Sequence, residues 1–227
     1  MRFLNSRYAN TYTQTPTRSM DRSTFIQKTY QFFAASMLSG AAGAYAGMSM
    51  IGFIQQYFIG LVILEFVLLF AVMFTKKMAG LNMMLLFAFT FVSGLTLVPL
   101  LSMALAMSGG AGIIANAFAT TSAIFAALSV YAMKTKTDFS SWGKPLLIAM
   151  VVIIISSLVN AFVFHSPLVH IAINAVFLLV LSGMVLFDTQ NIIRGAYETP
   201  VQGAIALYLD FLNMFIIILQ FFMGSRD

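Results

Sequence analysis

The sequence predicts an all-α integral membrane protein with a single membrane domain. Of its 227 residues, 60% are hydrophobic and only 8% are charged, and the mean hydropathy is +0.93. Soluble domains are about 45–50% apolar and about 25% charged, so this composition is that of a membrane protein. Cysteine is absent, which excludes disulfides and thiolate metal sites.

Seven continuous apolar runs are each long enough to cross about 30 Å of hydrocarbon as a helix. Backbone groups in lipid must be satisfied internally, so helices are expected, and the alternation typical of barrel strands is missing. We therefore expect seven transmembrane helices, at about residues 29–52, 57–75, 81–107, 112–133, 145–164, 168–190 and 201–223.

Residues 1–26 read as a polar cytosolic tail and residues 27–227 as the membrane domain. The tail carries several arginines among Ser, Thr, Tyr and Gln, and no apolar stretch of 7–15 residues follows its start. A secretory signal peptide is therefore not expected, and an organelle-targeting peptide is the less favoured alternative.

Small residues recur at four-residue spacing in the first run. Ser39, Gly43 and Gly47 form one row, and Ser36, Gly40 and Ala44 form a neighbouring one. Such rows let two helix backbones approach closely. We favour packing within one chain over a dimer interface.

Cations divide the connections into two classes. The tail with Lys28 and the loops after the second, fourth and sixth runs hold 11 Lys or Arg, whereas the other face holds only Arg226. By the positive-inside rule the N-terminus is cytosolic and the C-terminus lies outside. Topology and anionic headgroups thus explain the pI near 9.6, and no nucleic-acid partner is expected.

Three further features, in the second and third runs and after the fifth, were considered for a role in function. Glu65 lies near the middle of the second run, and Pro99 lies inside the third, where it should kink the helix. His165 and His170 flank Pro167 after the fifth run, a poor spacing for one metal site, so solvated histidines are expected.

The last two runs each carry an aspartate, Asp188 and Asp210, and form an antiparallel hairpin joined by "GAYETP". A carboxyl in the membrane costs about 2.5–3.5 kcal/mol on insertion scales, so the acids need an offset. The hairpin allows the two carboxyl groups to meet. Two close carboxyl groups share one proton and titrate together.

Such a pair is a candidate proton switch and a transient ligand for calcium, which prefers hard oxygen ligands. The protonated pair holds the helices together, and the ionised pair repels and presents oxygens to a cation. Glu65 is a candidate third acid along the same path. Nearby polar groups that could support the pair are Asn213, Tyr208 and Gln190.

Three motifs resemble the Bax inhibitor family, also called transmembrane Bax-inhibitor-motif proteins. They are "FDTQ" at 187–190, "LYLDFLNMF" at 207–215 and "GLTLVP" at 94–99, and the resemblance extends from about residue 25 to the C-terminus. It implies seven helices with the last one central, a di-aspartyl pH sensor at Asp188 and Asp210, and a calcium leak. Some relatives carry a basic latch in the second span, whereas this second span carries Glu65.

We therefore expect a pH-gated calcium leak channel in a bacterial plasma membrane, with calcium and protons as the species it handles, no cofactor and no enzymatic activity. The main alternative is a non-conducting scaffold that modulates another membrane protein, such as a membrane-bound protease, through its cytosolic tail. A proton-coupled transporter is a third alternative. An intramembrane aspartyl protease is disfavoured because no Gly-x-Gly-Asp motif is present.

Overall fold

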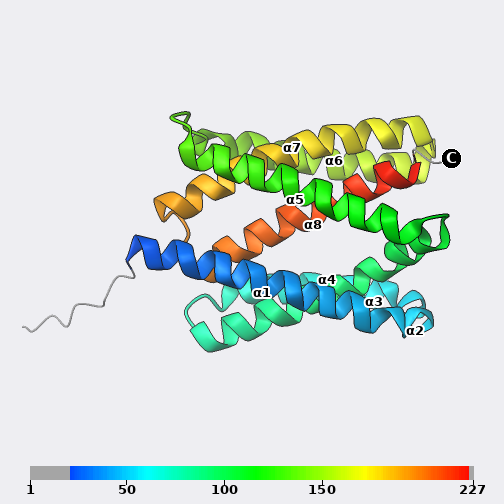
Figure 1. Cartoon of the computed structure of the whole chain (residues 1–227), viewed down its shortest axis with the longest axis horizontal. Coiled ribbons are helices and arrows are strands. Elements are labelled where there is room, and N and C mark those ends of the chain that lie inside the picture. The colour runs from blue at the N-terminus through cyan, green and yellow to red at the C-terminus, as the bar shows by residue number, and fades with distance from the viewer. Residues whose placement is uncertain (1–20, 225–227) are drawn as a thin grey trace, which may run out of the picture.

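The computed structural model describes residues 21–224, and every regular element in that range is a helix. Figure 1 shows the helices running roughly parallel to one long axis. Three elements are short: α2 (Ile51–Gln56), the 3-10 turn η1 (Ser140–Trp142) and η2 (Asn160–Phe164), a π-helical turn that continues α6. The long helices are α1 (Arg22–Met48), α3 (Phe58–Phe74), α4 (Ala79–Ala106), α5 (Gly110–Lys134), α6 (Gly143–Val159), α7 (Pro167–Arg194) and α8 (Pro200–Gly224).

The all-α prediction is confirmed for the described residues. Five helical segments have the length and apolar composition to cross a membrane: α4, α5, α6 with its flanking turns, α7 and α8. Helix α3 is apolar but has only 17 residues, and α1 is rich in small and polar residues. The seven expected runs all lie on long helices, while the count of seven spans stays a prediction.

Helix α1 begins at Arg22, so residues 22–26, which the sequence assigned to the polar tail, form its first turns. The positive charge of Arg22 does not prevent the helix, because Phe25 and Thr29 already pack inside the bundle. The predicted tail up to residue 20 lies outside the described residues.

Helix α8 forms the centre of the bundle (Figure 1) and packs against α1, α4, α5 and α7. In its most apolar segment 56% of the residues are buried, whereas only 17% are buried in the corresponding segments of α6 and α7. Leu207, Met214 and Leu219 of α8 are fully buried. The central last helix that the family resemblance implied is therefore present.

The small residues of α1 pack against α4. A Cβ atom on Gly43 would lie 2.0 Å from the carbonyl oxygen of Phe91, and one on Gly94 would lie 2.0 Å from the carbonyl oxygen of Gly40. The two backbones approach so closely that only hydrogen fits at these positions. The preferred interpretation of the small-residue rows, packing within one chain, is confirmed.

Helix α4 continues as a helix through Pro99 to Ala106. Ser102, one turn later, donates its hydroxyl to the carbonyl oxygen of Val98 at 2.6 Å. The kink expected at Pro99 stays a prediction.

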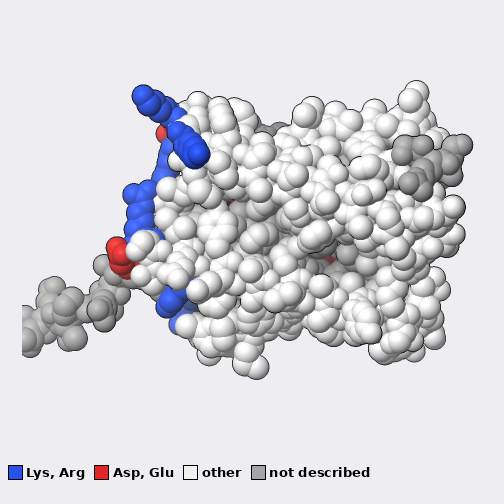
Figure 2. Space-filling view, viewed as in Figure 1, with Lys and Arg blue, Asp and Glu red and all other residues white. Residues whose placement is uncertain are grey.

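The Lys and Arg residues of the described chain gather at one end of the bundle, as Figure 2 shows. This end comprises the start of α1 and the α3–α4, α5–α6 and α7–α8 connections. Ion pairs join these connections, Lys76 with Glu198 and Arg194 with Asp138, and Arg22 donates to the carbonyl oxygen of Ile193. The two classes of connection therefore lie at opposite ends of the bundle, as the predicted topology requires.

Candidate functional site

The two aspartates of the last helices meet inside the bundle. Asp188 is 2% exposed and Asp210 is 4% exposed, and the two carboxyl groups lie within electrostatic reach of each other. The sequence allowed this meeting without requiring it. The structure therefore brings together the two acids that were predicted to form the sensor.

The turn between α7 and α8 makes this contact possible. Gly195 adopts φ +71°, a left-handed conformation that suits glycine and ends α7, and its backbone N–H bonds the carbonyl oxygen of Ile192. Pro200 then begins α8, a position where its missing N–H costs nothing. The connection between them is short, so α7 and α8 run antiparallel as neighbours.

Tyr197, in this connection, is a third member of the site. Its hydroxyl donates a 2.6 Å hydrogen bond to Oδ1 of Asp188. Burial, and then the negative charge of Asp188, raise the pKa of Tyr197, so its phenol remains a neutral donor. Sequence reasoning missed Tyr197, although it lies in the "GAYETP" connection between the two predicted acids.

The environment of Asp210 limits the charge that the pair can hold. Its Oδ2 atom is buried and has no hydrogen-bonding partner within residues 21–224, and no Lys or Arg in that range pairs with either aspartate. Two ionised carboxylates in this setting would repel without compensation. The pair is therefore best accommodated with one shared proton, and loss of that proton favours separation of the helices.

The three predicted supporting groups hydrogen-bond residues other than the pair, and their supporting role stays a prediction. Gln190 accepts from the backbone N–H of Phe139 at 2.9 Å and donates to the carbonyl oxygen of Thr137 at 2.8 Å. Because Gln190 and Tyr208 each lie two residues from an aspartate, helix geometry turns them about 200° away. The remaining hydrogen bonds join the Tyr208 hydroxyl to Ser93 Oγ and the carbonyl oxygen of Thr90, and the Asn213 amide to the carbonyl oxygen of Leu209.

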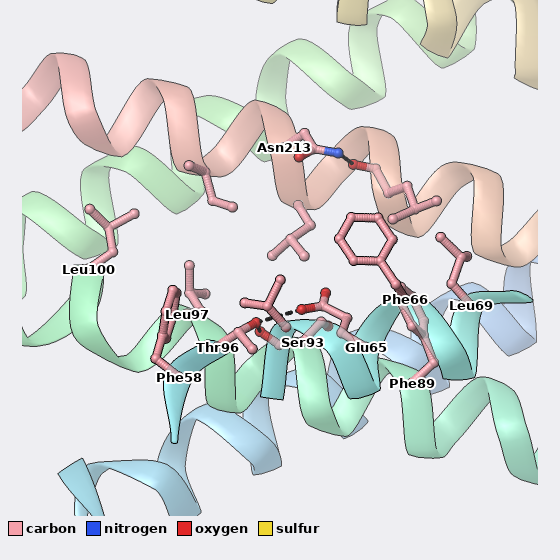
Figure 3. Close-up of a pocket in the computed structure, with 14 residues that line it drawn as sticks. Phe58, Glu65, Phe66, Leu69, Phe89, Ser93, Thr96, Leu97, Leu100 and Asn213 are labelled. Atoms are coloured by element: carbon pink, nitrogen blue, oxygen red, sulfur yellow. Dashed lines mark hydrogen bonds between the residues drawn. The ribbon is translucent and has the colours of Figure 1, made fainter. Parts of the chain in front are cut away.

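Glu65 lies apart from the aspartates, in a cavity of about 360 Å³ bounded by α3, α4 and α8 (Figure 3). The hydroxyl of Thr96 donates to Oε2 of Glu65 at 2.9 Å, and Asn213 lines the same cavity from α8. Neither Asp188 nor Asp210 lines this cavity. A role for Glu65 as a third acid in a conduction path stays a prediction.

The aspartate pair is not a complete metal site by itself. Within the described range no three His, Cys, Asp or Glu side chains converge on one point. Calcium prefers six to eight oxygen ligands, so a calcium ion at the pair would be bound only transiently.

Of the two loop histidines, His165 adopts φ +49° at the end of η2, and His170 Nε2 lies 3.1 Å from the amide nitrogen of Asn174.

Comparison with known proteins places these features in a family context. The family model described as "Inhibitor of apoptosis-promoting Bax1" matches residues 22–227. An uncharacterized protein of Campylobacter jejuni is 52% identical over 208 residues, which cover 90% of both chains. The Escherichia coli "Modulator of FtsH protease YccA" is 37% identical over 142 residues, 62% of this chain and 64% of that protein. The Escherichia coli inner membrane protein YbhL is 32% identical over 82% of each chain.

Proposed function

The chain belongs to the family of the inhibitor of apoptosis-promoting Bax1 and is an integral protein of the bacterial inner membrane, and from that premise we propose that it is a non-enzymatic regulator of another membrane protein. The observation that carries this proposal is its similarity to a relative whose name describes it as a modulator of the FtsH protease. The partner class that we propose is accordingly a membrane-bound protease.

The aspartate pair gives the regulator a means of changing shape. With one proton shared, α7 and α8 stay closed; after its loss the two charges repel. Helix α8 packs against α1, α4, α5 and α7, so a displacement of α8 would be transmitted to several helices at once. In this proposal the protonation state of the pair selects between two shapes that the partner distinguishes.

The proposed topology is seven crossings, α1, α3, α4, α5, α6, α7 and α8, with the N-terminus in the cytosol. The gathering of the described cations at one end supports it (Figure 2). Because the chain has no cysteine, single cysteines can report each side. A membrane-impermeant maleimide added to intact spheroplasts should label Ser49→Cys and spare Thr137→Cys until the membrane is opened; the reverse pattern would refute the topology.

The regulatory role is tested with the full chain and the membrane-bound protease of the same bacterium in proteoliposomes. We expect the protein to copurify with the protease and to change its rate of degrading a membrane substrate. Asp210→Asn should retain copurification while altering the rate effect. A protease whose rate and retention are unaffected by the wild-type protein would exclude this function. Removal of residues 1–20 tests whether the cytosolic tail supplies the contact.

A calcium leak is the second candidate function, and the burial of Asp188 and Asp210 on the neighbouring helices α7 and α8 is the observation that favours it. Opening of the pair would expose carboxylate oxygens to a divalent cation within the bundle. Calcium entry into liposomes that hold the purified protein should then vary between about pH 6 and about pH 8, with the dependence lost in Asp210→Asn. Flux equal to that of empty liposomes across this range would leave the regulatory role alone.

A further inference from the structure

The cavity beside Glu65 has the size and placement of a binding site that opens sideways towards the bilayer. Its volume of about 360 Å³ lies within the range of small-ligand pockets. Helix α3 forms one wall and α8 the other, with α4 between them (Figure 3). Phe66 at its rim is 57% exposed, so the cavity can be reached from the side of the bundle.

The central helix is uncovered along this cavity. On α8, Leu209, Asn213 and Ile216 are only partly buried and line the cavity, whereas Asp210, Met214 and Ile217 beside them are buried. Spacings of four and three residues place the partly buried set on one face of α8. One face of the central helix α8 is therefore not covered by the rest of the described chain and is available to another molecule.

Glu65 provides this cavity with an acid whose charge, when it is ionised, no cation of the described chain neutralises. It lies about 15 Å along the helix axis from Thr75, where the basic end of the bundle begins. Within residues 21–224 it forms no ion pair, and its hydrogen-bond donor is Thr96. A carboxylate at such a depth is costly without a counter-charge, so a cationic ligand is the natural complement.

The rest of the lining favours an organic cation over a metal ion. The rings of Phe58, Phe66 and Phe89 and several leucines line the same cavity as the carboxylate, and aromatic faces attract ammonium groups. A single carboxylate among mostly apolar walls does not supply the oxygen ligands that a calcium or magnesium ion requires. The volume suits a small molecule, whereas a partner transmembrane helix would need a groove about 20 residues long.

We propose that this cavity binds a small amphiphilic organic cation, an ammonium group on an apolar body, with Glu65 as the counter-ion and the phenylalanine rings around the charged group. Such a ligand would enter from the bilayer between α3 and α8. The proposal does not depend on whether the protein modulates a protease or conducts calcium.

The test measures saturable binding of octyltrimethylammonium to the protein in nanodiscs of uncharged lipid, with empty nanodiscs as background. Octanol serves as the neutral reference and octyl sulfate as the anionic one. We expect the wild type to prefer the ammonium probe, and Glu65→Gln to weaken its binding by about tenfold or more while octanol binding is unchanged. Glu198→Gln, which removes an acid at the basic end, should bind like the wild type.

Val62→Trp fills the cavity from α3 and should abolish binding of both the ammonium probe and octanol, which localises the site even if Glu65→Gln is poorly folded. Binding of the ammonium probe that is equal in wild type, Glu65→Gln and Val62→Trp would overturn the proposal. Binding of octyl sulfate as tight as that of the ammonium probe would also overturn it, because the carboxylate would then not select charge.

Discussion

The hydroxyl of Tyr197 lies 2.6 Å from Oδ1 of Asp188 and ties the α7–α8 connection to the buried carboxyl pair. The connection is therefore part of the site and not only a link between two helices. A movement that separates Asp188 from Asp210 must therefore either move Tyr197 together with Asp188 or break this hydrogen bond. The structure thus couples the pair in the bundle to the basic end of the molecule, where the neighbouring Glu198 pairs with Lys76.

Tyr197→Phe should destabilise the protein without changing its fold. The variant removes a donor from a buried carboxyl group, and hydrogen bonds to charged groups contribute about 1.5–3 kcal/mol. We expect a loss of that size in the free energy of unfolding, measured by denaturant titration in detergent. Tyr57→Phe is the matched control, because Tyr57 is 50% exposed. Equal losses in both variants would show that the hydrogen bond to Asp188 contributes nothing.

The single tryptophan can report protonation of the pair. Trp142 lies on η1, its ring centroid is 4.8 Å from that of Phe139, and it borders Gly183 of α7. We expect its fluorescence to change between about pH 5 and about pH 8 as α7 moves, and Asp188→Asn and Asp210→Asn to abolish the change because an amide does not titrate. A response that persists in both variants would assign it to other groups.

Asp138 supplies the control for that measurement. The backbone N–H of Ser140, and then Arg194, lower the pKa of Asp138 to about 2. A lowered pKa means that its contribution to stability is present above the unfolded value of about 3.9 and is lost only as the pH falls towards about 2. Asp138→Asn should therefore leave the Trp142 response between about pH 5 and about pH 8 unchanged. A displaced response would place the titration at the surface ion pair.

Gly43→Ala should be strongly destabilising, because the new Cβ atom would lie 2.0 Å from the carbonyl oxygen of Phe91. Relief requires α1 and α4 to separate, and overpacking of this kind costs about 1–3 kcal/mol or more. Gly60→Ala is the control, since a Cβ atom there meets nothing within 4 Å. Thermal unfolding in detergent should show a lower midpoint for the first variant and little change for the second. Matching midpoints would mean that the α1–α4 contact is loose.

Much of the fold could be predicted from the sequence because the membrane restricts the choices. Backbone polar groups in lipid must be paired internally, so long apolar runs imply helices, and each expected run lies on one. The close packing of α1 at Gly43 was also accessible, because small residues at regular spacing indicate where helix backbones meet, whereas its partner Gly94 was not predicted.

The site was only partly predictable for a geometric reason. The two aspartates could be identified because a carboxyl group in an apolar run is rare. Whether they meet depends on the rotation of α7 about its axis, which the apolar pattern does not determine. For the same reason the sequence did not indicate that Gln190 and Tyr208 hydrogen-bond residues outside α7 and α8. Tyr197 was missed because loop tyrosines are common and its contact depends on the path of the turn.

The central position of α8 has a consequence for how the protein is made. Ribosomes deliver the chain from its N-terminus, so α1, α3, α4, α5, α6 and α7 emerge before the helix around which they pack. Until α8 arrives, the faces that will cover Leu207, Met214 and Leu219 have only lipid or one another to contact. Assembly is therefore completed by the arrival of the last long helix, and a chain cut short before Pro200 would reach the membrane with its helices but without its core.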